Sequence, residues 1–110
     1  MRRIGFLPDV TLFKPHGVPM SDPEVVVITH EELEAIRLVD FLDLDQEEAA
    51  SRMEVSRRSM AADLRRARWK IADALLHGKA LSIEGGDFLF QRGNNGMHQQ
   101  QGVNEDAIWR

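Results

Sequence analysis

The chain has 110 residues, with 18 acidic and 14 basic side chains and a formal net charge of −4. This length suits one domain with a modest core and is too short for two. The absence of cysteine excludes a disulfide framework, a cysteine-based zinc site and a thiol nucleophile. No apolar run is long enough to span a bilayer, and no signal-peptide core follows the first basic residues. We therefore expect a cytoplasmic protein with no membrane partner.

The first 20 residues predict an extended, irregular arm rather than a helix. They contain three prolines and two glycines, with apolar anchors such as Ile4 and Phe6. Arg2 and Arg3 are candidates for contact with a DNA minor groove, as in the basic arms of some DNA-binding domains. Frayed terminal arginines are the commoner alternative.

A β-branched run at residues 25–28 predicts a short buried strand. Thr29 follows as a helix N-cap, with Glu32 at the capping-box position, and the helix is expected to run to about Leu42. Its apolar residues spread around most of the circumference. We therefore expect it to be covered on more than one side, by the following helices and by the arm, the strands or a second subunit.

Residues 45–78 predict two helices joined by a tight corner, which is the arrangement of a helix-turn-helix. Asp45 is placed to cap the first helix, with Glu48 three residues later to complete a capping box. Ser56 is placed to cap the second helix, which contains no proline or glycine until Gly78 ends it.

Steps of about 100° per residue divide the second helix into a core stripe and an outward basic face. The predicted core stripe consists of Met60, Leu64, Ala67, Ile71, Ala74 and Leu75. The predicted outward face consists of Arg58, Ala62, Arg65 and Trp69, flanked by Ser59 and Arg66. Residues 56–70 carry six basic side chains and one acidic one, a local charge of 6 − 1 = +5 in a chain that is negative overall.

In a helix-turn-helix the second helix lies in the DNA major groove, with basic side chains on base edges and phosphates. The candidate DNA-binding residues are therefore Arg57, Arg58, Ser59, Ala62, Arg65 and Arg66. A merely solvated charged face is the structural alternative. The functional alternative is a protein-interaction module of the same shape that binds RNA polymerase or another regulator. No nucleophile–base pair, metal cluster or cofactor loop is visible, so we expect neither an enzyme nor a cofactor.

Residues 79–84 alternate apolar and polar side chains and predict a second strand, which pairs with the first within one chain or between two. Residues 88–90 add an apolar anchor, and residues 91–110 predict a mobile polar tail. The expected fold is mainly α. It is a three-helix helix-turn-helix domain over residues 1–90, with an extended N-terminal arm and two short β-strands.

Trp69 lies on the outward face more than three turns beyond the start of its helix, so we expect protein rather than DNA to cover it. The helix that follows Thr29 is apolar nearly all round, and two isolated strands need a packing partner. Together these features predict a homodimer. Its two recognition helices would read a two-fold symmetric site on double-stranded DNA.

Several motifs resemble those of an uncharacterised prokaryotic UPF/DUF family whose members are predicted to bind DNA. They are Phe6-Leu7-Pro8, Phe13-Lys14-Pro15, Gly17-Val18-Pro19, Glu32-Leu33-Glu34-Ala35-Ile36-Arg37-Leu38, Gln46-Glu47-Glu48-Ala49-Ala50, Val55-Ser56-Arg57, Ala72-Asp73-Ala74-Leu75 and Gly78-Lys79-Ala80-Leu81-Ser82-Ile83-Glu84-Gly85-Gly86. The helix-turn-helix portion is similar to region four of the sigma-seventy factors. The resemblance implies a transcriptional regulator that places its second helix in promoter DNA.

The chain departs from that family pattern at the corner of the helix-turn-helix. The pattern favours glycine there, whereas this chain has Glu54. The backbone at Glu54 therefore either avoids the left-handed conformation or tolerates about 1 kcal/mol of strain. The family's arm also tends to carry cysteines, which are absent here.

Overall fold

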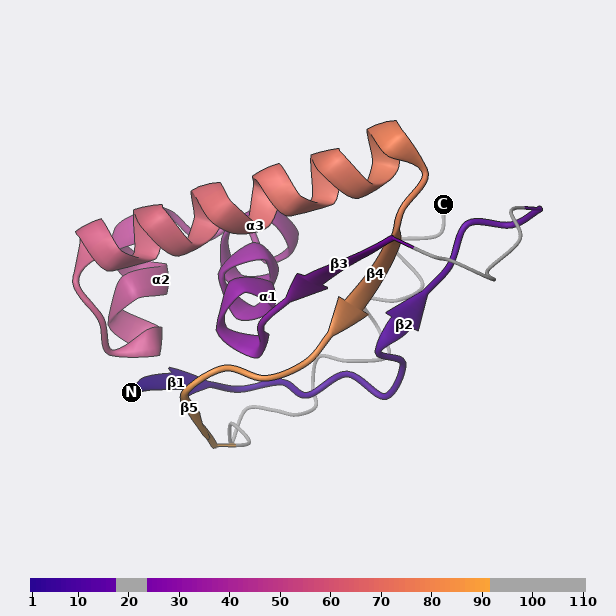
Figure 1. The fold of residues 1–110 in the computed structure, drawn as a ribbon. Coiled ribbons are helices and arrows are strands. Elements are labelled where there is room, and N and C mark those ends of the chain that lie inside the picture. The colour runs from indigo at the N-terminus through magenta and orange to yellow at the C-terminus, as the bar shows by residue number, and fades with distance from the viewer. Residues whose placement is uncertain (18–23, 92–110) are drawn as a thin grey trace.

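The computed structural model describes residues 1–17 and 24–91, so the predicted mobile tail from residue 92 onward lies outside the described residues. In chain order the elements are β1 (Arg2–Ile4), β2 (Leu12–Phe13), β3 (Val25–Ile28), α1 (His30–Ile36), η1 (Arg37–Phe41), α2 (Gln46–Met53), α3 (Arg57–His77), β4 (Ala80–Ile83) and β5 (Phe88–Phe90). Figure 1 shows α3 along one side of the molecule. The helix α2 lies beneath its first turns, α1 lies beneath its middle turns, and β3 and β4 lie toward its later turns.

The expectation of a mainly α fold with two strands is wrong, because the described residues form five strands in two sheets beside the helices. In the first sheet β1 pairs with β5 in parallel. In the second sheet β4 lies between β2, which is antiparallel to it, and β3, which is parallel to it. Two short segments of the arm and the apolar anchor at 88–90 are therefore strands, while the other described residues of the arm are irregular. The predicted pairing of residues 25–28 with 79–84 is confirmed, and it lies within one chain.

The helices begin at the predicted capping residues. Thr29 caps α1 with a complete capping box, since Thr29 Oγ1 accepts from the Glu32 N–H at 3.2 Å and a Glu32 carboxylate oxygen accepts from the Thr29 N–H at 3.0 Å. Asp45 caps α2 by accepting from the Glu48 N–H at 2.8 Å. The expected second capping box is not formed, because the Glu48 carboxylate binds Arg52 instead.

The first helix continues past Ile36, as predicted, but with a different hydrogen-bond pattern. Residues Arg37–Phe41 form a π-helical segment, η1, in which the Leu42 N–H donates to the Arg37 carbonyl oxygen at 2.8 Å. The long helix α3 is capped by Ser56 at its start and by Gly78 at its end, where φ is 66°. This left-handed conformation favours glycine.

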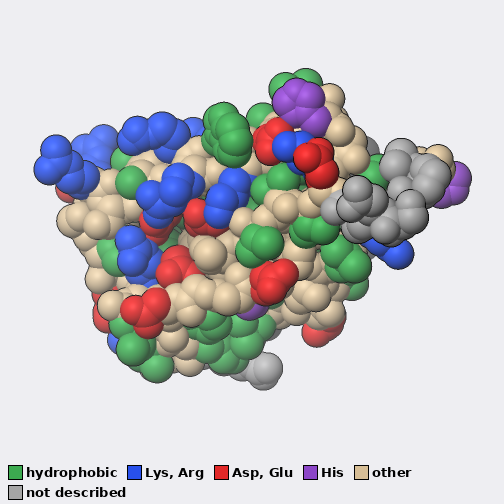
Figure 2. Space-filling model, viewed as in Figure 1, with side chains coloured by type: hydrophobic (Ala, Val, Ile, Leu, Met, Phe, Trp, Pro, Cys, Tyr) green, Lys and Arg blue, Asp and Glu red, His purple; other side chains and the backbone are tan. Residues whose placement is uncertain are grey.

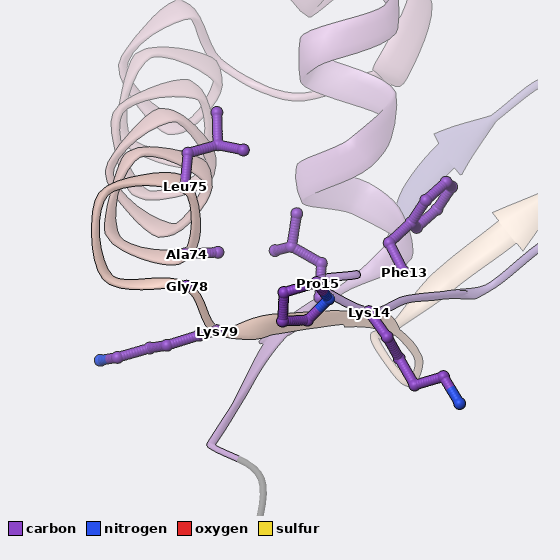
Figure 3. A pocket seen from close by; sticks show the side chains of 8 residues that line it. Phe13, Lys14, Pro15, Ala74, Leu75, Gly78 and Lys79 are labelled. Carbon is purple, nitrogen blue, oxygen red and sulfur yellow. The ribbon is translucent and has the colours of Figure 1, made fainter. Parts of the chain in front are cut away.

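The core lies between the three helices and β1. Its buried members are Ile4, Ala35, Leu38, Ala49, Ala50, Met53, Met60 and Leu64. Of the predicted stripe of α3, Met60, Leu64, Ala67 and Ala74 are buried and Ile71 is half-buried, but Leu75 is 74% exposed. The last turns of α3 run past the main core, and Leu75 there lines a shallow open hollow beside Phe13 and Pro15 (Figure 3).

The corner between α2 and α3 resolves the two alternatives left open for Glu54. Its φ of 60° and ψ of 46° place it in the left-handed region, so the corner tolerates the strain. The carboxylate of Glu54 binds Arg3 at 2.8 Å. No helix in the described part of the chain is both long enough and apolar enough to cross a membrane.

Candidate nucleic-acid interface on helix α3

Half of the basic side chains counted in residues 56–70 are already held in ion pairs. These pairs join Arg66 to Asp63 and Glu32, Arg68 to Asp40, and Lys70 to Glu32. The nitrogen–oxygen distances do not exceed 3.2 Å. The local charge of +5 expected from the sequence therefore overstates the charge that a ligand can meet.

The other three arginines stand at the N-terminal end of α3. Arg57, Arg58 and Arg65 are exposed, and none forms an ion pair with the residues that the structure describes. Figure 2 shows Lys and Arg side chains gathered over this end of the helix. The positive end of the α3 dipole lies there as well, so an anion is favoured by both the side chains and the backbone.

The face of α3 that points away from the core changes character along its length. We call Arg58, Ala62, Arg65, Trp69, Ala72 and Leu76 the outward face, since they follow one another at spacings of three and four residues. Its first half is basic and its second half is apolar, and in Figure 2 hydrophobic side chains stand on the later turns of α3. The expectation that protein covers Trp69 is not met by residues 1–17 and 24–91, because the indole is 67% exposed.

The remaining candidate residues have structural contacts of their own. Ser59 is half-buried, and both its N–H and its hydroxyl oxygen are bonded to Ser56 Oγ, at 3.0 and 3.1 Å. Arg66 lies beside the outward face but is fixed by Asp63 and Glu32. Ala62 is half-buried, with its methyl group between Arg58 and Arg65 on the helix surface. The structure thus brings Arg58, Ala62 and Arg65 together on one face.

Buried carboxylates beneath this face were missed by the sequence analysis. Asp63 is 1% exposed and binds Arg2, with Arg2 Nε 2.7 Å from Asp63 Oδ2, as well as Arg66. Neither arginine of the arm is frayed, since Arg2 is held by Asp63 and Arg3 by Glu54. A minor-groove contact by Arg2 would therefore require a buried ion pair to break. The one sequence signal for this site is that Asp63 borders the core stripe.

Glu32 on α1 is the second such carboxylate, and it is 4% exposed. Burial alone would raise the pKa of Glu32. Hydrogen bonds from Lys70 and the Thr29 backbone, together with Arg66, outweigh burial and hold this pKa below its ordinary value. Glu32 is therefore an anion at neutral pH. It neutralises Lys70 and part of the charge of Arg66.

A third carboxylate, that of Asp73, lies near the C-terminal end of α3. The Asp73 carboxylate lies 2.8 Å from His77 Nδ1 and accepts from Lys79 Nζ at 3.0 Å. These hydrogen bonds, that of His77 first, lower the pKa of Asp73. Lys79 follows the C-cap glycine, so this group ties the end of α3 to the start of β4.

The fold and this face define a class, that of small proteins with three helices, two short sheets and a cationic helix end. In residues 1–17 and 24–91 no three metal-ligating side chains gather into a site. The chain belongs to the family described as "Protein of unknown function DUF134", which matches residues 1–91. The predicted resemblance to an uncharacterised UPF/DUF family is thereby confirmed, whereas its DNA-binding features stay predictions.

Archaeal and bacterial relatives carry only a family name. A "UPF0251 protein" of Methanosarcina acetivorans is 51% identical over 106 residues, which cover 96% of this chain and 88% of the relative. A UPF0251 protein of Thermoanaerobacter sp. is 50% identical over 99 residues, which cover 86% of this chain and 88% of the relative. One from Moorella thermoacetica is 55% identical, covering 77% of this chain and 57% of the relative. No solved structure matches the chain significantly.

Proposed function

We propose that this protein is a transcriptional regulator that binds double-stranded DNA, with α2 and α3 acting as a helix-turn-helix. One observation carries the proposal. In a chain of net charge −4, three exposed arginines without ion-pair partners in the described residues stand on the first three turns of a capped helix. Apart from Lys14 in the arm, the exposed basic side chains that lack ion pairs in the described residues are thus gathered toward one end of one helix, which suits the insertion of that end into a groove.

The side chains of the outward face have distinct roles in this proposal. Arg58 and Arg65 are the candidates for bidentate contact with guanine, and Arg57 is placed for a phosphate near the helix N-terminus. Ala62 offers a methyl group between the two arginines, which suits contact with the methyl group of thymine. Arg66 contributes less, since DNA would have to compete with Asp63 and Glu32 for its guanidinium group.

The first test measures duplex binding by fluorescence anisotropy. Arg58→Ala and Arg65→Ala should each weaken binding by about 1 to 3 kcal/mol if the contact is to guanine, and by less if it is to phosphate. The matched control is Arg68→Ala, which removes an exposed arginine of the same helix that is paired with Asp40. An Arg68→Ala loss as large as the other two, or no loss in the double variant of Arg58 and Arg65, contradicts the proposed face.

The salt dependence of binding separates contact with DNA from binding of a protein. With about three phosphates neutralised, log affinity should fall with log salt at a slope of about −0.9 per phosphate. Arg57→Ala should reduce this slope by about one unit.

Selection from random duplexes then tests regulation, because a regulator must enrich a sequence motif. Binding without an enriched motif would leave DNA binding intact and remove the regulatory role.

A further inference from the structure

The apolar half of the outward face has no cover in the described chain. Trp69 is 67% exposed and Leu76 is 77% exposed, with the exposed Ala72 between them. Figure 1 shows α3 on the outside of the molecule along its whole length, so a second helix has room to lie against it. Neighbouring exposed apolar side chains that include a tryptophan are typical of protein–protein contact sites.

The chemistry of this face is complementary to itself about Trp69. Seven residues to either side stand Ala62 and Leu76, a small and a large apolar side chain. Four residues to either side stand Arg65, a cation on the face, and Asp73, an anion that borders the face and is 13% exposed. When two antiparallel helices are related by a two-fold axis at Trp69, each residue faces the one at the same distance on the other side. Leu76 then packs over Ala62 of the second copy, and Arg65 meets its Asp73.

The charged groups that this pairing needs are present in the single chain. Arg65 is exposed and makes no ion pair within the described residues. Asp73 is held as an anion by His77 and Lys79. A carboxylate has about four acceptor positions, so these two contacts leave capacity for a guanidinium group.

We propose that a second copy of this chain binds the outward face of α3, with the two helices antiparallel about Trp69, and that this dimer hides the DNA-binding face. The claim that the dimer hides the DNA-binding face rests on the proposed function. The arrangement differs from the expected reader of a two-fold symmetric site, because the basic half of each outward face is covered by the apolar half of the other copy. Dimerisation therefore withdraws Ala62 and Arg65 from DNA and regulates binding through protein concentration.

Sedimentation equilibrium at tens of micromolar tests the dimer. The wild-type chain should be dimeric and Leu76→Ser monomeric. The matched control is Leu75→Ser, which alters a neighbour of similar exposure, 74% against 77%, that lies off the outward face. Both leucines are largely exposed, so both variants should remain folded. A monomeric wild-type chain, or equal weakening of the dimer by the two variants, overturns the proposal.

Charge exchange tests the register of the two helices. Arg65→Asp places two anions opposite each other, and Asp73→Arg places two cations opposite each other, so each variant alone should be monomeric. An equimolar mixture restores two pairs of opposite charge and should be dimeric. Circular dichroism checks that each variant is folded. Two folded variants that stay monomeric when mixed overturn the antiparallel register.

Competition with DNA tests whether the dimer prevents DNA binding. Dimerisation reduces the apparent DNA affinity in proportion to the monomer fraction, so Leu76→Ser should bind about tenfold more tightly where one wild-type chain in ten is monomeric. Leu75→Ser should match the wild type. Weaker DNA binding by Leu76→Ser overturns mutual exclusion and favours a dimeric reader. If the wild-type chain forms the dimer of the proposed register but monomeric Leu76→Ser binds no duplex, the interface is upheld and the proposed function is refuted.

Discussion

Glu54 holds a left-handed backbone conformation, with φ 60°, at the corner between α2 and α3. This conformation costs a residue with a β-carbon about 1 to 2 kcal/mol. Glycine avoids that strain, but its unfolded chain is more flexible, so it loses about 0.5 to 1 kcal/mol more in backbone entropy on folding. The lost pair with Arg3 is exposed and contributes little. We expect Glu54→Gly to raise the free energy of unfolding by about 0.5 to 1 kcal/mol in urea denaturation.

The control for this substitution is Asp43→Gly, at a φ of 64°. Aspartate adopts the left-handed region more readily than glutamate, so the gain should be smaller. A destabilised Glu54→Gly variant would mean that the carboxylate of Glu54 contributes more than the backbone strain costs.

Asp63 is the residue at which one substitution should cost most stability without altering volume. Its carboxylate is 1% exposed and holds Arg2 of β1 as well as Arg66 of α3. We expect Asp63→Asn to lower the free energy of unfolding by about 3 kcal/mol, because both guanidinium groups lose their anion. Asp40→Asn removes an exposed pair with Arg68 and should cost less than about 1 kcal/mol. Equal losses in thermal unfolding would contradict a structural role for the buried pair.

At the scale of elements, the helices could be predicted because their signals are local. Thr29, Asp45 and Ser56 each accept a backbone hydrogen bond from the residue three positions later, and sequence spacing reports such contacts directly. The strands of two or three residues could not be predicted. A strand as short as β2 has no measurable alternation, and its partner, β4, lies far along the chain.

The candidate face was predictable in position but not in charge. The outward placement of Arg58 and Arg65 follows from helical spacing alone. The neutralisation of Arg66 and Lys70 depends on Glu32, which stands 34 and 38 residues away in the sequence. Such pairs form through the packing of α1 against α3, and no local pattern encodes them.

The connection between β4 and β5 is held against the start of α1, and the Glu31 carboxylate occupies the space that a β-carbon at Gly86 would need. The Asp87 N–H donates to the Glu31 carboxylate at 3.0 Å, and a β-carbon on Gly86 would collide with Glu31 Oε1, so the Glu31 side chain would have to move and give up this hydrogen bond. The φ of Gly86 is also 109°, which other residues rarely adopt. We expect Gly86→Ala to lower the free energy of unfolding by about 2 kcal/mol.

Gly85→Ala is the matched control for Gly86→Ala. Gly85 has a φ of 74° but open space around its β-carbon position, so an alanine there suffers only the strain of the left-handed backbone. Its loss in urea denaturation should be about 1 kcal/mol. If the two losses were equal, the crowding by Glu31 would have no part in the effect.

At the scale of the whole molecule, Glu32 makes the free energy of unfolding depend on pH in the acid range. Its pKa is lowered by folding, so its contribution is complete above its ordinary value of 4.5 and is lost as the pH falls through the lower folded value. We expect Lys70→Gln to lower the free energy of unfolding at neutral pH by about 1 kcal/mol and to flatten its decline below pH 4.5. Thermal unfolding across this range measures both effects. Lys14→Gln, at an exposed site without an ion pair in the described residues, should change neither.

The parallel pairing of β1 with β5 has a consequence for the newborn chain. Ile4 is 0% exposed in the folded protein, and its strand pairs with residues up to Phe90. A ribosome adds about 5 to 20 residues per second, so β1 waits for several seconds until β5 has been made. Contacts among α1, α2 and α3 can form earlier, because these helices are close in sequence. A chain released before Phe90 therefore lacks the partner strand of β1, so the backbone of β1 stays unpaired while Ile4 packs against the helices alone.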